Sequence, residues 1–313
     1  MADLRFCAYQ YQHLPLEALH RRWRDAERLG FDVLWNCDTV VEPDRERHTM
    51  FDGPATLTLM ASGTSSIRVG TLVTSLYFRH PVTLTKAADH LSGGRVELAL
   101  GVGDPSAGAK AAGVDWPPGV QVARFVEFVE LVDLLLREEV TSYVGRFYRC
   151  EGAETVPLPV QRPRPPVTIA AHGPKMLRIA AQHGDGWSSW GGYDVATAED
   201  FYAVTADRSH RFDDLCADAG RDPTTIRHSL VCFPPLTPGS RWSTSTTWSV
   251  ASARSASTSS SCTGRRPGAT LLARRRYSRK SPPPSCPRCG RTTVRMSVSN
   301  SLGRTPGVPL SAA

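Results

Sequence analysis

The last quarter of the chain has no acidic residue. Residues 241–313 contain 13 Lys and Arg side chains and no Asp or Glu. The whole chain has 37 basic and 30 acidic residues, so residues 1–240 hold 37 − 13 = 24 basic against 30 acidic side chains, a balance of −6. The formal charge of +7 therefore comes from the tail, and the rest of the chain has no basic excess that would indicate a nucleic-acid partner.

Features of several other protein classes are also missing. No apolar run approaches the roughly 20 residues that a membrane span requires, and the N-terminus lacks the basic-then-apolar pattern of a signal peptide. We therefore expect a cytoplasmic protein without a membrane partner. The eight cysteines are irregularly spaced, and only Cys286 and Cys289 have metal-ligand spacing, with no second Cys or His pair after them. Neither a disulfide framework nor a metal site is expected.

Side-chain chemistry is equally sparse. The sequence contains no recognisable Ser/His/Asp triad, no Walker A loop and no histidine cluster. Without a cofactor, the chain has no evident chemistry of its own.

Residues 4–235 alternate between strand-like and helix-like segments. This alternation predicts a parallel α/β fold, specifically a TIM barrel, and seven β units leave it one short of the usual eight. We expect a barrel domain over residues 1–238 that lacks its eighth β unit. The predicted strands are residues 4–9, 32–36, 67–74, 96–100, 166–171, 186–190 and 227–233.

Residues 239–313 differ sharply from the barrel segment. Ser, Thr, Arg and Pro dominate and apolar periodicity is lost, so we expect a disordered, low-complexity basic tail. One interpretation is a natural basic tail. The other is a reading-frame slip near residue 240, because shifted GC-rich codons for residues 242–262 can encode an acidic amphipathic helix, a glycine and an apolar strand. The shifted sequence would supply the missing β unit. A barrel without that unit would have two exposed sheet edges.

A TIM barrel places its active site at the carboxyl ends of its strands, so the residues there are the candidates. Asp38 follows the second predicted strand and either hydrogen-bonds a cofactor or substrate or caps a helix. Gly101 and Gly103 follow the fourth and either let a flat ring approach the backbone or form a tight turn.

The loop after the fifth predicted strand, residues 171–175, suits a phosphate group. A small, glycine-containing turn that opens a helix presents free backbone N–H groups and the positive end of the helix dipole. Lys175 adds a positive charge. His172 in this loop is either a phosphate-side residue or proton donor, or a structural histidine.

Several short motifs follow one another along residues 4–235. Their order and spacing resemble those of the luciferase-like monooxygenases. Any single motif is weak evidence for this family, but the ordered set is specific. The motifs are Leu29-Gly30-Phe31-Asp32, Arg68-Val69-Gly70-Thr71, Arg79-His80-Pro81, Ser92-Gly93-Gly94-Arg95, Gly101-Val102-Gly103, Gly145-Arg146-Phe147-Tyr148 and Gly184-Asp185-Gly186-Trp187.

The resemblance implies a TIM barrel that binds FMN or the deazaflavin coenzyme F-420 (F420) and oxidises, reduces or oxygenates a small organic substrate, with a homodimer as one assembly to expect. It implies that Asp38 contacts the ring or substrate, and that Leu72 and Val73 form a non-proline cis peptide or bulge behind the ring. The remaining cofactor-binding residues that it implies are Ser75, Gly101 and Gly103 on the ring side, and Ala171, His172, Gly173, Trp190, Gly191 and Gly192 on the phosphate side.

The sequence departs from the family pattern at Thr39. Many members have His directly after the acidic residue of the second strand, so a sugar-phosphate dehydrogenase that uses this His is disfavoured. The GC-rich codon bias inferred for the tail is typical of an actinobacterium-like source, in which the deazaflavin is common, and therefore favours F420 over FMN. The alternative function is a non-catalytic, truncated or frameshifted product of such an enzyme gene.

Overall fold

The computed structural model describes residues 4–39, 50–84, 88–104, 107–192, 195, 197–232 and 248–254. The chain divides into two compact units at residue 260, and all of these residues belong to the first unit. None of the helices in the described parts is long and apolar enough to span a membrane.

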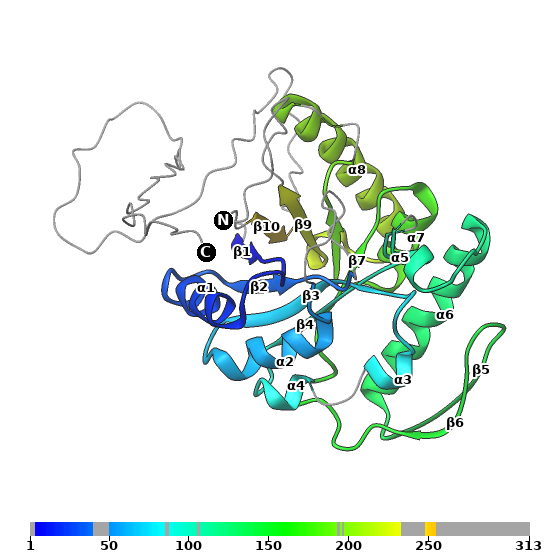
Figure 1. Ribbon diagram of the computed structural model, residues 1–313. Helices are drawn as coiled ribbons and strands as arrows, with labels where there is room; N and C mark the ends of the chain where they lie inside the picture. The colour runs from blue at the N-terminus through cyan, green and yellow to red at the C-terminus, as the bar shows by residue number, and fades with distance from the viewer. Residues whose placement is uncertain are drawn as a thin grey trace, which may run out of the picture. The chain divides into compact units, whose positions relative to one another are not determined.

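A closed barrel forms the centre of this unit (Figure 1). Seven of its strands are parallel and follow one another around the barrel in chain order, as the alternating pattern predicted. The seven parallel strands are β1 (Arg5–Tyr9), β2 (Val33–Asn36), β3 (Arg68–Ser75), β4 (Val96–Gly101), β7 (Val167–Ala170), β8 (Gly186–Ser189) and β9 (Arg227–Cys232).

Helices cover the outside of the strands (Figure 1). An antiparallel hairpin of β5 (Val140–Val144) and β6 (Arg149–Glu154), which the sequence patterns did not predict, forms a separate small sheet. The helices are α1 (Leu16–Arg28), α2 (Gly53–Gly63), α3 (Pro81–Leu84), α4 (Ala88–Leu91), α5 (Ala107–Ala111), α6 (Pro118–Arg137), α7 (Pro174–His183), α8 (Ala198–Asp218) and the short 3₁₀ helix η1 (Pro223–Thr225).

The eighth position of the barrel is occupied by β10 (Trp248–Arg254). This strand pairs antiparallel with both β1 and β9. The eighth position is thus held by an antiparallel strand rather than by a parallel β unit, and the expectation of two exposed sheet edges was wrong. Backbone hydrogen bonding to two neighbours closes the barrel, although the strand is rich in Ser and Ala. β10 lies within the segment that we expected to be a disordered tail, and the rest of that segment lies outside the described residues.

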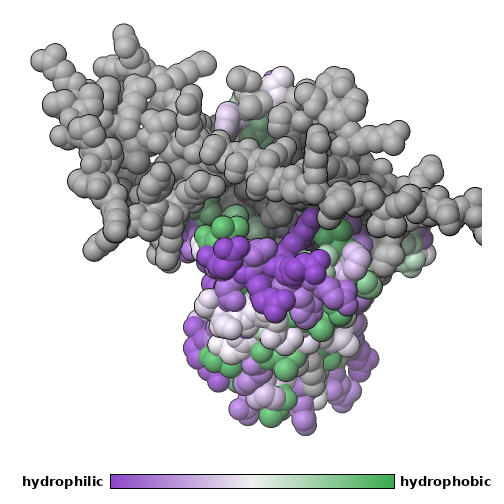
Figure 2. Space-filling view, turned by 60° about the vertical axis from the view of Figure 1, so that its left-hand side comes forward, coloured by the Kyte–Doolittle hydropathy of each residue, from purple (hydrophilic) through white to green (hydrophobic). Residues whose placement is uncertain are grey.

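The helices pack on the barrel through amphipathic faces. In α1, Leu19, Trp23 and Ala26 are buried, whereas charged residues on its other face are exposed. Figure 2 brings the α1 side of Figure 1 forward and shows hydrophilic residues gathered there. The outer core between helices and strands also includes the fully buried Phe128 and Trp187.

The barrel interior differs at its two ends. At the amino ends of the strands, Glu97 on β4 is 4% exposed and accepts hydrogen bonds from Arg5 at 2.6 and 2.9 Å and from Nε of Arg68 at 2.6 Å. Further along the strands, the interior is an apolar cluster. Its buried members are Cys7, Tyr9, Val33, Trp35, Cys37, Leu72, Ala99 and Val231, and Tyr11, Met50, Val73 and Trp190 pack against it with part of their surface exposed.

Candidate functional site

Asp38 lies directly beyond the carboxyl end of β2 and is 7% exposed. Its Oδ1 accepts a hydrogen bond from Nη2 of Arg79 at 2.8 Å, and its Oδ2 accepts from Nε of the same guanidinium at 3.2 Å. The backbone N–H of Ser75 donates to Oδ2 at 3.2 Å. Arg79 also pairs with Asp52, the N-cap of α2. Asp38 therefore joins the loops after β2 and β3, and both of its oxygens have donors within the protein.

The pKa of Asp38 reflects this buried position. Burial raises the pKa above its usual range, while the hydrogen bonds and charge of Arg79 and the Ser75 N–H oppose the rise. The family resemblance implied that Asp38 contacts the ring or the substrate. Its geometry suits it first to position the loop that carries Ser75 and Arg79.

Leu72 and Val73 lie in the second half of β3. The peptide bond between them is cis, as the resemblance implied, and the register with β4 shifts between Thr71 and Thr74. Leu72 is buried within the interior apolar cluster, and Val73 packs against that cluster while remaining partly exposed. Val73 thus offers apolar surface at the end of the barrel where a ligand would bind.

The two glycines after β4 accommodate side chains of β3. A Cβ on Gly101 would lie 2.7 Å from Cγ2 of Val73, and a Cβ on Gly103 would overlap the Oγ of Ser75. Ser75 is 1% exposed, and its hydroxyl donates to the Val102 carbonyl at 3.3 Å. The immediate neighbours of Gly101 and Gly103 are therefore Val73 and Ser75, so these glycines first serve close packing between β3 and the loop after β4.

The loops after β7 and β8 meet through direct hydrogen bonds. The Ala171 N–H donates to the Ser188 carbonyl at 3.1 Å, and the Trp190 N–H donates to Nε2 of His172 at 3.3 Å. The rings of His172 and Trp190 lie 5.6 Å apart between centroids. The structure thus brings together the two loops that the sequence assigned to the phosphate side.

His172 is a neutral imidazole near neutral pH. Burial and, to a smaller extent, the nearby charge of Arg208 together lower its pKa to about 4. Because Nε2 accepts the Trp190 N–H, the ring proton belongs on Nδ1. His172 is consequently a hydrogen-bond donor through Nδ1 rather than a cation.

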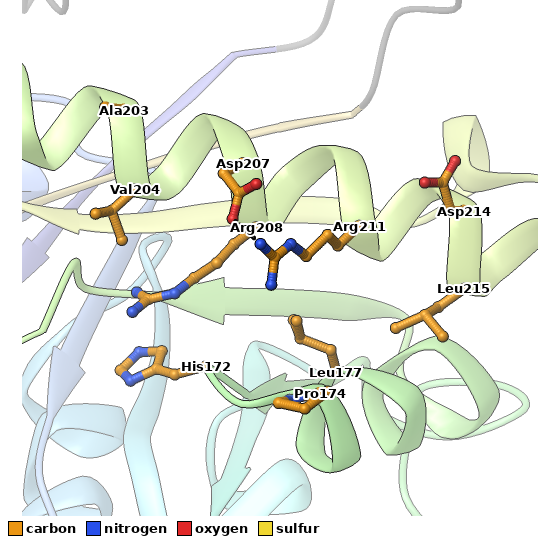
Figure 3. A pocket seen from close by; sticks show the side chains of 10 residues that line it. All are labelled: His172, Pro174, Leu177, Ala203, Val204, Asp207, Arg208, Arg211, Asp214 and Leu215. Carbon is orange, nitrogen blue, oxygen red and sulfur yellow. Dashed lines mark ion pairs between the residues drawn. The ribbon is translucent and has the colours of Figure 1, made fainter.

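A cavity of about 720 Å³ opens between the start of α7 and the face of α8 (Figure 3). This volume lies within the roughly 300–1,000 Å³ of small-molecule sites. The guanidinium of Arg208 reaches from α8 toward His172 (Figure 3), and its Nη1 donates to Oγ of Ser189 at 3.2 Å. The cavity is lined by His172, Pro174, Leu177, Ala203, Val204, Asp207, Arg208, Arg211, Asp214 and Leu215.

Two arginines of the site were not among the candidates from the sequence. Arg79 carried a signal, because it belongs to one of the family-like motifs, but its role as the partner of Asp38 requires the fold. Arg208 carried none, since an arginine among the charged residues of a helix is normally part of a solvated face.

Two half-buried histidines, His172 and His228, are expected to make stability depend on pH. Burial lowers the pKa of His228 on β9, as of His172, from 6.5 to about 4. A base with a folded pKa below its unfolded value binds protons more readily when unfolded, so its stabilising contribution is complete above pH 6.5 and is lost as the pH falls toward 4. We expect the free energy of unfolding to fall by up to about 1.4 kcal/mol per pH unit for each histidine in this window.

Urea denaturation between pH 7 and pH 5 tests this expectation. The variants His172→Gln and His228→Gln should each flatten the pH dependence relative to the unchanged chain. A variant that loses as much stability over this interval as the unchanged chain would assign the effect to other groups.

The described residues contain no group of three or more His, Cys, Asp or Glu side chains that could hold a metal ion. They do fit a flat cofactor with a phosphate. Val73 and Trp190 provide partly exposed apolar surface, and a Cβ on Gly173 would meet no atom within 4 Å. Near Gly192, the closest atom to such a Cβ is Nη2 of Arg208 at 3.7 Å. Space is therefore open beside the backbone at Gly173, whereas a side chain at Gly192 would contact Arg208.

Comparison with known proteins identifies relatives of this fold. Residues 5–236 match the family model for luciferase-like monooxygenases. The chain is 33% identical over 214 residues to the F420-dependent hydroxymycolic acid dehydrogenase of Mycobacterium tuberculosis, which covers 66% of this chain and 56% of that protein. It is 32% identical over 164 residues to the 5,10-methylenetetrahydromethanopterin reductase of Archaeoglobus fulgidus, covering 51% of this chain and 45% of that protein. The chain thus spans about half the length of these two relatives.

Solved structures show the same fold. An F420-dependent secondary alcohol dehydrogenase superposes with a TM-score of 0.62 at 21% identity, covering 72% of this chain and 66% of that one. A monooxygenase from Streptomyces bottropensis superposes with a TM-score of 0.56 at 25% identity, covering 66% of this chain and 61% of that one. With the barrel, the strand-end loops and the match over residues 5–236 in agreement, the chain belongs to the luciferase-like monooxygenase family.

Proposed function

We propose that the chain is an oxidoreductase that transfers hydride between F420 and a small organic substrate at the carboxyl end of the barrel. The observation that carries this proposal is the pairing of an apolar surface with open backbone. Val73 and Trp190 form the apolar surface, and Gly173 leaves space beside the loop after β7. Relatives whose names specify F420 support the choice of cofactor.

A bound deazaflavin supplies the hydride chemistry, and the residues of the chain bind and orient it. Leu72 and Val73 would lie behind the ring, and Asp38 would hold the neighbouring loop in place through Arg79. His172 would donate from Nδ1 on the phosphate side. Asp38 is not assigned as the group that donates a proton to the substrate, because both of its oxygens already accept hydrogen bonds.

FMN-dependent monooxygenation is the second candidate function. It is favoured by the structural likeness to the monooxygenase from Streptomyces bottropensis and would use the same apolar surface and phosphate-side loops. Thr39, in place of the His of many family members, argues against a sugar-phosphate substrate for either chemistry.

Titration of the purified full chain with F420 and with FMN tests the proposal. We expect F420 to bind and to lose its oxidised absorbance when small secondary alcohols are added without oxygen. Oxygen uptake with reduced FMN, and no F420 turnover, would instead favour monooxygenation. Binding of neither cofactor would identify the chain as a non-catalytic product of an enzyme gene.

The role proposed for Asp38 leads to a matched pair of variants. Asp38→Asn removes the charge at the buried end of Arg79, and Asp52→Asn removes it at the exposed end while keeping a good N-cap for α2. Because a hydrogen bond to a charged group contributes about 1.5–3 kcal/mol, we expect Asp38→Asn to weaken F420 binding at least about tenfold. Asp52→Asn should change the dissociation constant less than about twofold. Equal effects of the two variants would contradict a specific role for Asp38.

A further inference from the structure

The loop after β1 begins with an alternation of tyrosine and glutamine over residues 9–12. Both glutamines are buried and anchor the loop. The side chain of Gln10 donates a hydrogen bond to the Tyr11 carbonyl at 2.8 Å, and the side chain of Gln12 donates to the Cys37 carbonyl at 2.6 Å. The loop is therefore held against the loop after β2, and Tyr11 has a fixed place at the carboxyl end of the barrel.

Tyr9 and Tyr11 both belong to the apolar cluster of the barrel interior. Tyr9 is a buried member and is 6% exposed, whereas Tyr11 packs against the cluster with part of its surface exposed. The two rings meet edge to face, with their centroids 5.3 Å apart and their planes at 83°. Val73 and Trp190, which form the surface proposed for the cofactor ring, pack against the same cluster. Tyr11 thus shares one apolar cluster with the proposed ring site.

The side chains of the two tyrosines are also connected by hydrogen bonding. Burial and, to a smaller extent, the charges and side-chain hydrogen bonds of Cys37 and Tyr11 raise the pKa of Tyr9 well above its usual range. Tyr9 consequently keeps its proton and is the donor in its hydrogen bond with Tyr11. A phenol whose oxygen accepts a hydrogen bond gives up its own proton more readily, because that bond stabilises the phenolate.

We propose that the Tyr11 hydroxyl exchanges a proton with the oxygen of an uncharged ketone or secondary alcohol, and that Tyr9 positions it. The inference rests on the proposed function and names the proton donor of that hydride transfer. Both oxygens of Asp38 already accept hydrogen bonds, and Trp190 offers only an indole N–H, which is a donor but not an acid. The apolar surroundings favour an uncharged substrate, because an unpaired charge there would lose its hydration.

The proposed step moves one proton from Tyr11. Reduced F420, when bound, supplies a hydrogen with its electron pair to the carbonyl carbon. As the carbonyl π bond breaks, its oxygen forms an O–H bond with the proton of Tyr11. The Tyr11 phenolate keeps the electron pair of the broken O–H bond, is stabilised by the hydrogen bond from Tyr9, and regains a proton from water. The ketone is thereby reduced by two electrons to an alcohol, and alcohol oxidation follows the same steps in reverse.

Removal of the Tyr11 hydroxyl tests the inference by rate and by binding. Because a positioned acid contributes about 100- to 10,000-fold to a rate, Tyr11→Phe should lower kcat for cyclohexanone reduction at least about 100-fold. It should weaken cyclohexanone binding to the chain loaded with oxidised F420 by about 2- to 10-fold, which corresponds to one neutral hydrogen bond, and leave the F420 dissociation constant within about twofold. Tyr202→Phe is the matched control, because Tyr202 is exposed on α8, and it should change these values less than about twofold.

The variant Tyr9→Phe tests the positioning role. It should lower kcat by about 3- to 10-fold, since it removes one hydrogen bond to the Tyr11 oxygen. Cyclohexanone binding should not change, because the ketone oxygen contacts Tyr11. A parallel loss of kcat and of cyclohexanone binding would assign Tyr9 a packing role and overturn its positioning role.

The outcomes separate this inference from the proposed function. Turnover in the unchanged chain with an undiminished kcat in Tyr11→Phe would overturn the role of Tyr11 and leave the cofactor assignment intact. If the unchanged chain does not bind F420, the proposed function fails and the role of Tyr11 fails with it. If Tyr11→Phe does not fold, as judged by thermal melting, Tyr9→Phe decides: a lower kcat with unchanged cyclohexanone binding supports the inference, and an unchanged kcat overturns it.

Discussion

Replacement of Glu97 by glutamine is expected to lower the free energy of unfolding by about 3–5 kcal/mol, because it leaves buried guanidinium charge without a counter-ion. The Glu97 side chain is 5% exposed and the Arg5 side chain is 16% exposed. Both oxygens of Glu97 are bound by Arg5, and Arg68 binds the same carboxylate. Loss of this stability is comparable to the whole stability of many domains, so the variant should accumulate largely as unfolded or aggregated protein.

The hydrogen bonds of Glu97 with Arg5 and Arg68 also predict that the stability of the protein falls at low pH. Burial opposes the ionisation of Glu97, but the hydrogen bonds and charges of Arg5 and Arg68 outweigh burial and hold the pKa below its usual 4.5. The stabilising contribution is therefore present above pH 4.5 and is lost as the pH falls through the lower, folded-state pKa. Chemical denaturation at pH 7 measures the effect of the substitution. Asp25→Asn is its control, because the Arg28–Asp25 pair is exposed and should contribute less than about 1 kcal/mol. A loss at Glu97 as small as that at Asp25 would contradict the prediction.

Substitution of Gly103 by alanine is the second change for which we expect a large effect. Gly103 has φ of +94°, a conformation that costs an L-residue roughly 1–2 kcal/mol. The new Cβ would also overlap Oγ of Ser75 and lie 2.9 Å from its Cβ, and overpacking of this kind costs about 1–3 kcal/mol. The sum is about 2–5 kcal/mol, from the same two sources.

Gly113 provides a control that isolates the overlap. Its φ is +65°, but a Cβ there would meet no atom within 4 Å, so Gly113→Ala should cost only the conformational part of the change. Denaturation of both variants gives the difference. F420 titration should show weaker binding for Gly103→Ala alone, because a shifted Ser75 disturbs the hydrogen bond from its N–H to the Asp38 carboxylate, next to the proposed ring site. Equal losses in the two variants would show that the Ser75 side chain yields without cost.

Local patterns predicted most of the elements that build the barrel. The strands at residues 4–9 and 96–100 and the helix after Gly173 were predictable, because apolar periodicity and Gly or Pro punctuation are local properties. The Leu72–Val73 position followed from the family resemblance. Strand β10 was not predictable in this way, since Ser and Ala in its sequence give no strand preference. Its conformation follows from hydrogen bonding to β1 and β9, which is a tertiary effect.

The candidate site shows the same boundary between local and tertiary information. The fold brings His172 and Trp190 together as the sequence suggested, because both residues directly follow neighbouring parallel strands. The cavity that His172 shares with Arg208 depends on how α8 packs against α7, which no spacing along the chain encodes. Asp38 was located correctly at a strand end, but its ion pair with Arg79 joins residues 41 positions apart.

The pairing of β10 with β1 has a consequence for the order of events during synthesis. The seam that closes the barrel joins residues 5–9 to residues 248–252, which are the first and last strands of the folded unit. A growing chain emerges from its N-terminus onward, so β1 must wait for almost the whole unit to be translated before it gains this neighbour. Until then β1 and β9 each present an unsatisfied row of backbone groups, the usual starting point for association between nascent chains. We therefore expect barrel closure to be the last step of folding during synthesis, with the edges of β1 and β9 exposed until then.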